Sequence, residues 1–386
     1  MKKLYHILIT CFLAISFVFF AKANETKNEK ISFGGGTRQE FSKVVYKEFN
    51  ISEYGTTQLA NKYGKIDVHT WDGSQVKIKV SIIANCGSQA EAEKIFNRIR
   101  IDFYNDANFV KAATIISDEN SAWNWGWNNN KNADYAINYE VYYPRGNFLD
   151  LSNRYGDSYI GTSNGAVKAN VKYGNVRIED INNNLDVSLQ YGDAFIANVK
   201  KDMTADVDYG KLIMKSAEKI KINGDYSEFE VENASDLNIN TDYGTLRANK
   251  IGNLTSKMDY GHIKVKEVGN LNFDGDYTDV AVGYLGNFAQ IDMNYGSFCI
   301  DKLAKNFSEC RINADYTDVK IGTEDGCAYR LDAATDYGSI NYPAGMSVTS
   351  DKDDSGISER ISGFMGSKTA KGFMKVNLNY GGIKIR

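Results

Sequence analysis

The chain has 386 residues with a formal net charge of −4, and 42% of its residues are hydrophobic. It contains 34 Gly and 25 Tyr but three His and two Pro, a composition that suits regular β-structure and leaves few imidazoles for catalysis or zinc binding. The mildly acidic charge argues against nucleic acid and anionic membranes as partners, since both select for an excess of lysine and arginine.

The first 23 residues have the pattern of a secretory signal peptide. Lys2 and Lys3 form the charged start, residues 4–20 are almost wholly apolar, and Ala-Lys-Ala at 21–23 supplies a cleavage site. An uncleaved anchor is the alternative, but the apolar run is short and ends at that site. Cleavage also removes three lysines, so the formal charge becomes −7. We expect an exported protein of the periplasm, the outer-membrane surface or the extracellular medium, with no transmembrane span after signal removal.

Residues 24–146 are predicted to form an N-terminal α+β cap over the rest of the chain. Asp72-Gly73 is a turn signal, so we expect a hairpin there, with an alternating strand over 76–82 on one side of it. A further strand is expected over 137–143. Such a cap would shield the open edge of the first repeat from association with other sheets.

A short helix is predicted within this cap. Ser88 followed by Glu91 three residues later is a capping box, which marks a helix start. The apolar residues expected on the buried face of this helix are Ala92, Ile95, Phe96 and Ile99.

A tryptophan-rich segment follows the helix. Trp123, Trp125 and Trp127 alternate with polar residues in an Asn-rich stretch, so a strand here would present three indoles on one face. Exposed aromatic groups often mark binding sites, and these three residues are the candidate ligand-binding residues. The alternative is that the indoles pack over the cap as apolar cover.

The central part of the chain is a repeat. Tyrosines that precede Gly, Ser or Thr recur every 17 or 18 residues up to Tyr295 and every 21 residues after it. Units this short cannot each hold a core, so they must stack on one another. The tyrosines are Tyr155, Tyr173, Tyr191, Tyr209, Tyr226, Tyr243, Tyr260, Tyr277, Tyr295, Tyr316 and Tyr337.

Apolar residues occupy fixed places in each repeat. They lie six, four and two residues before the tyrosine, and three, five and eight residues after it, which is the period of two of a strand with one buried face. The phase slips by one residue at the tyrosine, and we expect the following glycine to turn a corner there with positive φ. These glycines are Gly174, Gly192, Gly210, Gly244 and Gly261.

This pattern predicts an all-β protein built as a single-stranded parallel β-helix, a solenoid of 17–21-residue coils. The array is expected over 147–342, bounded by Pro144 and Pro343, because a proline inside it would remove a ladder hydrogen bond. Residues 343–375 are predicted to be a long loop, and residues 376–386 repeat the template as a terminal strand that closes the end.

Two polar or aromatic columns follow from the repeat. Seven aspartates and one asparagine precede eight of the tyrosines. They could either gather calcium or cap their own turns by bonding an amide two residues on, and we favour the caps. The tyrosines share the parity of the buried positions, so we expect an internal aromatic ladder in place of an exposed binding stripe. The column before the tyrosines is Asp208, Asp225, Asp242, Asp259, Asp276, Asn294, Asp315 and Asp336.

The remaining reactive residues are few and scattered. Cys86, Cys299, Cys310 and Cys327 form no Cys-x-x-Cys motif, and we interpret them as buried small residues; a Cys310–Cys327 disulfide is the alternative. His69 and His262 stand apart from any Ser or Cys signature and are expected at the surface. We identify no catalytic or metal-binding residue and expect no cofactor.

The mature chain resembles the putative adhesin family of secreted bacterial β-helix proteins, which is common in Bacteroidetes and has no assigned activity. The resemblance rests on residues 63–72 (Tyr-Gly-Lys-Ile-Asp-Val-His-Thr-Trp-Asp), the helix after Ser88, residues 137–144 and the Tyr-Gly repeats. It implies an exported β-helix and supplies no catalytic motif. From the architecture, whose tight corners leave no long loops for a catalytic cluster, we expect a non-enzymatic, adhesin-like binding or structural module of the cell envelope or surface, with a surface glycan or envelope protein as partner. A carbohydrate-active β-helix enzyme acting on polysaccharide is the alternative.

Overall fold

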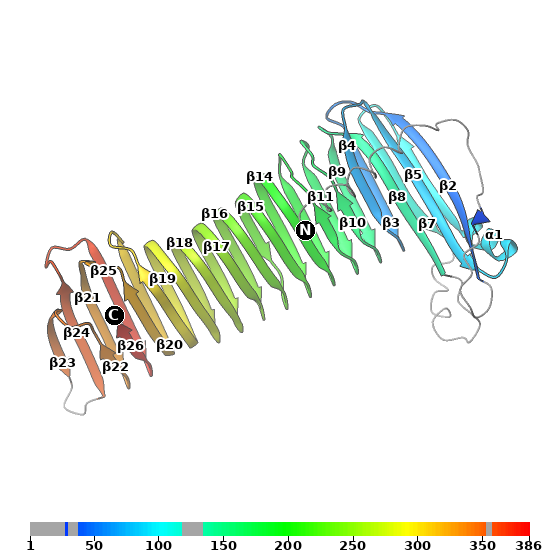
Figure 1. The fold of residues 1–386 in the computed structure, drawn as a ribbon. Helices are drawn as coiled ribbons and strands as arrows, with labels where there is room; N and C mark the ends of the chain where they lie inside the picture. The colour runs from blue at the N-terminus through cyan, green and yellow to red at the C-terminus, as the bar shows by residue number, and fades with distance from the viewer. Residues whose placement is uncertain (1–27, 30–37, 118–133, 353–356) are drawn as a thin grey trace, which may run out of the picture.

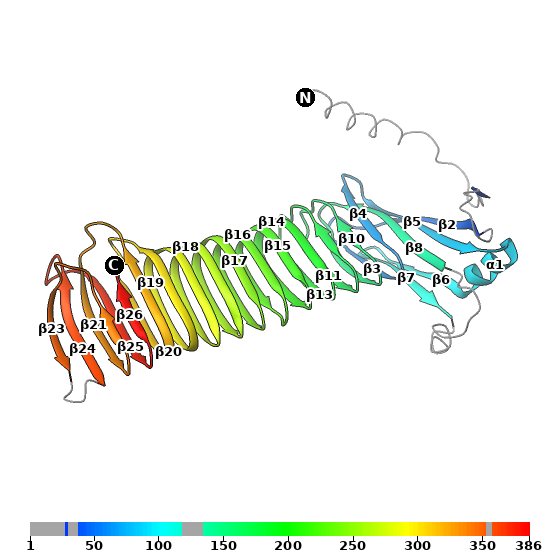
Figure 2. The same ribbon diagram turned by 60° about the horizontal axis from the view of Figure 1, so that its bottom comes forward.

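The computed structural model describes residues 28–29, 38–117, 134–352 and 357–386, and these residues form 26 strands and one helix. The strands lie side by side along an elongated molecule, with an N-terminal sheet at one end and a C-terminal hairpin at the other (Figures 1 and 2). The prediction of a nearly all-β chain with a long, mostly parallel sheet is confirmed.

The repeats pair in parallel with an offset of one repeat. Leu212 lies beside Ala194 on one side and Phe229 on the other, and Phe229 in turn lies beside Leu246. The strands of this region are β9 (Phe148–Arg154), β10 (Ser158–Ile160), β11 (Val167–Lys172), β12 (Val176–Ile178), β13 (Leu185–Gln190), β14 (Asp193–Asp208), β15 (Lys211–Asn223), β16 (Glu228–Asp242), β17 (Thr245–Asp259), β18 (Gly261–Asp276), β19 (Thr278–Leu303), β20 (Glu309–Thr323), β21 (Tyr329–Asp336) and β22 (Ser339–Asn341).

The core is the set of apolar columns that the repeat predicts. Stacking one repeat on the next buries each column continuously, and burial of one such side chain stabilises the fold by about 1.5–3 kcal/mol. In the repeat of Tyr191 the buried members are Leu185, Val187, Leu189, Ala194, Ile196 and Val199, each at most 3% exposed.

The N-terminal sheet does not contain the predicted hairpin at Asp72-Gly73. Strands β4 and β5 pair with opposite sides of β8, in parallel with β4 and antiparallel with β5. The turn therefore carries the chain past the end of β8, a strand that comes later in the sequence. The elements are β1 (Asn28–Glu29), β2 (Gln39–Asn50), β3 (Thr56–Lys62), β4 (Ile66–Trp71), β5 (Gln75–Cys86), β6 (Ile99–Asn105), β7 (Phe109–Ile116) and β8 (Asp134–Pro144).

The predicted helix is present as α1 (Gln89–Arg98). The Ser88 hydroxyl accepts a hydrogen bond from the Glu91 amide at 3.3 Å, and the Glu91 carboxylate accepts one from the Gly87 amide at 2.9 Å. The capping residues thus satisfy amides at the helix start that lack an intrahelical partner. Ala92, Ile95, Phe96 and Ile99 are buried, as expected.

The C-terminal region differs from the prediction in two ways. The expected long loop contains β23 (Ser347–Lys352) and β24 (Ser358–Met365), which pair antiparallel, and β24 also pairs with β21. The last strands, β25 (Gly372–Asn379) and β26 (Gly382–Ile385), do not close the end. They lie between β20 on one side and β21 with β22 on the other.

Candidate binding ridge

A column of tyrosines runs along the outside of the parallel sheet. Neighbouring ring centroids lie 4.6–5.2 Å apart and neighbouring ring planes differ by at most 8°. From Tyr155 onward the tyrosines are 38–57% exposed. In spatial order the column is Tyr63, Tyr155, Tyr173, Tyr191, Tyr209, Tyr226, Tyr243, Tyr260, Tyr277, Tyr295, Tyr316, Tyr380 and Tyr337.

The prediction of an internal tyrosine ladder is therefore wrong. All thirteen tyrosines have φ between 51° and 63°, in the left-handed region. Side chains alternate between the two faces of a sheet only while the backbone stays extended. A left-handed residue rotates the backbone, so the buried positions before the tyrosine do not predict which way the tyrosine ring points. The ring projects outward, and the next buried apolar side chain comes three residues later, as Val176 does after Tyr173.

The corner glycines do not adopt the positive φ predicted for them, so they are needed for another reason. A Cβ at Gly192 would lie 2.0 Å from the carbonyl oxygen of Gly174, and a Cβ at Gly174 would lie 2.2 Å from that of Gly156. Successive repeats approach so closely here that a side chain does not fit. The glycines thus allow close stacking, and the tyrosines take up the unusual backbone angle.

Three repeats replace the corner glycine by a hydroxyl residue and compensate elsewhere. The Ser227 hydroxyl donates to the carbonyls of Val207 and Asp225, each at 2.9 Å. In the same repeat Gly224 stands two residues before the tyrosine, where a Cβ would lie 1.8 Å from the Val207 carbonyl oxygen. Thr278 with Gly275 makes the same exchange. In the repeat of Thr317, whose hydroxyl donates to the Asp315 carbonyl at 2.9 Å, the small Ala314 takes the place of the glycine.

The residues immediately before the tyrosines, here called the flanking column, hold the repeats together. The Asp225 carboxylate accepts a hydrogen bond from the Asp242 amide at 3.1 Å, and the Asp259 carboxylate accepts one from the Asp276 amide at 2.8 Å. Each acceptor therefore bonds the next repeat, and the predicted cap on an amide two residues on is wrong. Desolvation, with the charges of Asp225 and Asp259, raises the pKa of Asp242.

The flanking column changes sign along the molecule. It begins with three cations: the Lys62 ammonium is 5.3 Å from the Tyr63 ring centroid, the Arg154 guanidinium 4.8 Å from that of Tyr155, and the Lys172 ammonium 5.6 Å from that of Tyr173. These are cation–π distances. Gln190 follows, and from Asp208 onward the column is acidic or amidic. We call the tyrosines and their flanking column the ridge.

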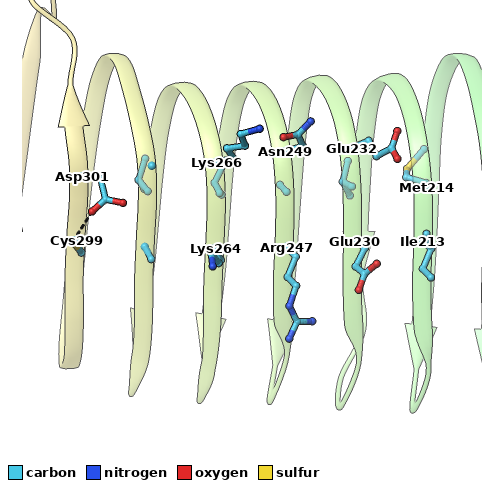
Figure 3. Close-up of a pocket in the computed structure, with 16 residues that line it drawn as sticks. Ile213, Met214, Glu230, Glu232, Arg247, Asn249, Lys264, Lys266, Cys299 and Asp301 are labelled. Atoms are coloured by element: carbon cyan, nitrogen blue, oxygen red, sulfur yellow. Dashed lines mark hydrogen bonds between the residues drawn. The ribbon is translucent and has the colours of Figure 1, made fainter. Parts of the chain in front are cut away.

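A second surface feature is a shallow groove of about 730 Å³ over the outward faces of β15 to β19. Figure 3 shows its side chains in two rows, one with Glu230, Arg247 and Lys264 and the other with Asn249 and Lys266. Several charges are paired within the fold, such as Glu230 with Lys211 at 2.7 Å and Arg247 with Glu228 at 3.4 Å. The groove offers mixed charge without a convergent set of reactive groups.

The four cysteines within the described part of the chain are free thiols, with Cys86, Cys310 and Cys327 buried as predicted and Cys299 partly exposed. No disulfide joins Cys310 to Cys327. Burial raises the pKa of Cys310 to about 12, and desolvation followed by the charge of Asp301 raises that of Cys299. High pKa values keep thiols protonated and weakly nucleophilic.

The other candidate residues are dispersed. The three tryptophans, Trp123, Trp125 and Trp127, and the predicted signal peptide lie outside the described residues. His69 is partly buried, with its ring centroid 5.2 Å from that of Tyr142, and His262 is exposed beside Asp279. Among the residues that the structure describes, no group of three or more His, Cys, Asp or Glu is arranged to hold a metal.

Within the same described ranges, no helix combines the length and apolarity that a membrane span requires.

No protein family and no curated protein matches this chain. Three solved structures that align with 89% of it are named as a putative cell adhesion protein from Clostridium sporogenes, a putative adhesin from Bacteroides fragilis and a putative lipid binding protein from Parabacteroides distasonis. Their identities are 8%, 12% and 11%, their TM-scores 0.18, 0.25 and 0.20, and the alignments cover 99%, 97% and 96% of those chains. The ridge has to be interpreted from its own geometry, because likeness at this level carries no functional argument.

Proposed function

We propose that this chain is an exported, non-enzymatic β-helix that acts as an adhesin-like binding or structural module of the cell envelope or surface. The observation that carries the proposal is the ridge, a column of thirteen stacked tyrosines on a regular frame, twelve of them 38–57% exposed. The partner would be a surface glycan or an envelope protein.

The repeat geometry supports a solenoid. Parallel pairing at an offset of one repeat, continued from β9 to β20, is what coils wound around a common core require. The buried columns on both sides of each tyrosine would then belong to one filled interior. Such a rod holds its surface groups at fixed spacing, which suits an extended or repetitive partner.

The tyrosines also have the chemistry of a contact surface. Tyrosine combines a large apolar ring with a hydroxyl, and it is enriched at protein interfaces and binding hot spots. Contiguous exposed aromatic groups are uncommon on soluble monomers, and where they occur they often mark interaction sites. In this column the ring faces cover one another, so the ring edges and hydroxyls are left to meet a partner.

A matched pair of variants tests the proposal. Tyr243→Asn, Tyr260→Asn and Tyr277→Asn together remove three rings, and asparagine tolerates the left-handed backbone. The control replaces three exposed residues of the same repeats by alanine: Asn238, Thr255 and Asn272. Retention on immobilised envelope fractions and on a polysaccharide panel should fall in the first variant and persist in the control. Equal retention by both variants, when each still has a cooperative melting transition above the assay temperature, contradicts the proposal.

The same panel separates a binding module from an enzyme. Incubation of the unmodified protein with each polysaccharide should release neither reducing ends nor unsaturated products. Reproducible release that increases with protein concentration would favour the carbohydrate-active alternative.

A further inference from the structure

We propose that the ridge binds a second copy of this chain, with the two rods antiparallel and a two-fold axis between Tyr191 and Tyr209. This inference rests on the proposed function, because it takes the ridge as a contact surface and identifies the envelope protein that meets it as a second copy of this chain. Two observations carry it: the spacing of the tyrosines and the change of charge sign along the flanking column.

The spacing favours a partner with the same repeat. The tyrosine rings recur every 4.6–5.2 Å, and a contact surface is extended over many repeats only if the partner presents groups at the same interval. A second copy meets this condition without any adjustment. A closed two-fold pair is also the commonest form of soluble oligomer, and its interface uses the same surface of both copies.

The charge sequence selects the orientation and the register. A two-fold axis perpendicular to both rods places each flanking column opposite the flanking column of the other copy, in reverse order. With the axis between Tyr191 and Tyr209, cations face acids and no like charges meet. The facing pairs are Lys62 with Asp259, Arg154 with Asp242, Lys172 with Asp225, and Gln190 with Asp208, each formed twice.

The column on the other side of the tyrosines agrees with this register. Two residues after each tyrosine stand exposed or partly exposed side chains, and in the same register Asp193 faces Lys211. The remaining facing pairs of this column are Lys65 with His262, Asp157 with Thr245, and Asn175 with Glu228, so no two acids oppose each other.

Several other arrangements bring like charges together. If the axis passes through Tyr209, Asp208 faces Asp208 of the other copy and Lys211 faces Lys211 of the other copy. If it passes through Tyr191, the Asp193 residues of the two copies face each other. Two parallel rods in register would place Asp225 against Glu228 and Asp276 against Asp279. Directly opposed like charges destabilise an interface, so these alternatives are disfavoured. An axis between Tyr173 and Tyr191 also avoids like charges, but it overlaps six tyrosines of each copy where the proposed register overlaps eight, and it leaves Lys172 opposite an uncharged residue.

Reciprocal charge exchange tests both the partner and the register. Variant one carries Arg154→Asp and Lys172→Asp, so that acids face acids in these two pairs. Variant two carries Asp225→Lys and Asp242→Lys, so that cations face cations in the same two pairs. Each variant alone should be monomeric in sedimentation equilibrium at about 50 mM salt, at concentrations where the unmodified protein is a dimer. Mixed in equal amounts, the two variants should form heterodimers, because every facing pair is then restored.

The outcomes distinguish this inference from the proposed function. A monomeric unmodified protein, or a mixture that remains monomeric, overturns the antiparallel pairing, whereas loss of envelope binding in the tyrosine variant would still support the binding ridge. Self-association of variant one as strong as that of the unmodified protein also overturns it. If a charge-reversed variant has a lowered melting temperature, the neutral pair Arg154→Gln with Lys172→Gln replaces it, and at least a tenfold weaker dimer is expected. Raising salt to about 0.5 M should likewise dissociate the unmodified dimer.

Discussion

At the residue scale, the ridge depends on tyrosines in a left-handed conformation. A residue other than glycine loses about 1–2 kcal/mol in this region, and each stacked aromatic pair returns about 0.5–1.5 kcal/mol. The tyrosine amide also bonds the neighbouring repeat, as from Tyr243 to the Asp259 carbonyl at 2.9 Å. Stacking on both sides therefore offsets the backbone cost, which explains how one ring type recurs at every corner.

Substitutions at Tyr243 separate the two contributions. Tyr243→Asn removes stacking with Tyr226 and Tyr260 but keeps a tolerated backbone, whereas Tyr243→Val removes stacking and adds β-branched strain. We expect both to lower the free energy of unfolding, and valine to lower it by about 1 kcal/mol more than asparagine. Urea unfolding measures the difference. Equal stabilities would show that the left-handed backbone is not strained here.

The corner glycines give a second residue-scale prediction. Gly192→Ala places a Cβ 2.0 Å from a carbonyl oxygen, while Gly286→Ala meets nothing closer than 3.5 Å and has no positive φ. We expect Gly192→Ala to cost about 1–3 kcal/mol through overpacking. Gly286→Ala should be neutral or slightly stabilising, because alanine reduces the entropy of the unfolded chain. Thermal unfolding of both variants checks this, and equal losses would contradict the close-stacking role.

Alkaline pH should weaken the fold through the stacked phenols. Desolvation, together with the charges of neighbouring ionised tyrosines and aspartates, raises the pKa of Tyr260 and Tyr316. Above about pH 10 the unfolded chain therefore releases protons that the folded chain retains, and stability falls as pH rises. The urea midpoint should decrease between about pH 9 and 11, and decrease less steeply when Tyr260 and Tyr316 are both replaced by Asn. The same slope in both proteins would exclude these tyrosines as the cause.

At the element scale, β25, the strand before the last, is an interior member of the sheet. Strand β25 pairs with β20 and with β21, so every amide of its backbone faces a partner strand. Asn377→Pro should remove one ladder hydrogen bond and leave a carbonyl unpaired, at a cost of roughly 1–3 kcal/mol. Asn377→Ala keeps the backbone and serves as the control. If the proline variant unfolds at the same urea concentration as the alanine variant, β25 is not an interior strand.

The limits of sequence reasoning are clearest in β8 and β25. Their alternating residues predict strands correctly, because one buried face requires a period of two. Alternation does not say which strand lies next to which, and both segments insert between strands that are neighbours in the sequence. Val376 continues the buried column of Ile312 and Ala333. An apolar residue here fits that column whether β25 lies at the end of the sheet or inside it.

The ridge was predictable in composition but not in orientation. The tyrosine spacing and the aspartates are read directly from the repeat, whereas the outward direction of the rings follows from one dihedral angle per repeat. A phase slip signals that some residue leaves the strand conformation. From the sequence alone, glycine is the residue expected to take a positive φ. The stacking that stabilises left-handed tyrosines exists only after the repeats assemble, so the sequence does not reveal it.

At the scale of the whole molecule, modular stacking makes repeat number adjustable. Each repeat contacts its neighbours through the same columns, so stability is distributed along the rod and does not rest on one closed core. Thr245 pairs with Glu228 on one side and His262 on the other, and these three residues are each 17 positions apart. Strands β16 and β18 therefore present matching registers if the repeat between them is removed.

Deletion of residues 244–260 tests this modularity. The deletion joins Tyr243 to Gly261, which restores an intact corner. It removes Leu246 and Leu254, whose columns are continued by the equivalent side chains of the adjacent repeats. We expect a folded protein with a cooperative melting transition and a rod about 4.8 Å shorter by solution X-ray scattering. Deletion of residues 244–251, eight positions of the same repeat, is the control: it moves the later apolar residues out of the buried columns and should abolish the cooperative transition. If both deletions unfold the chain equally, the repeats are not interchangeable units and the stacking that supports the ridge is wrong.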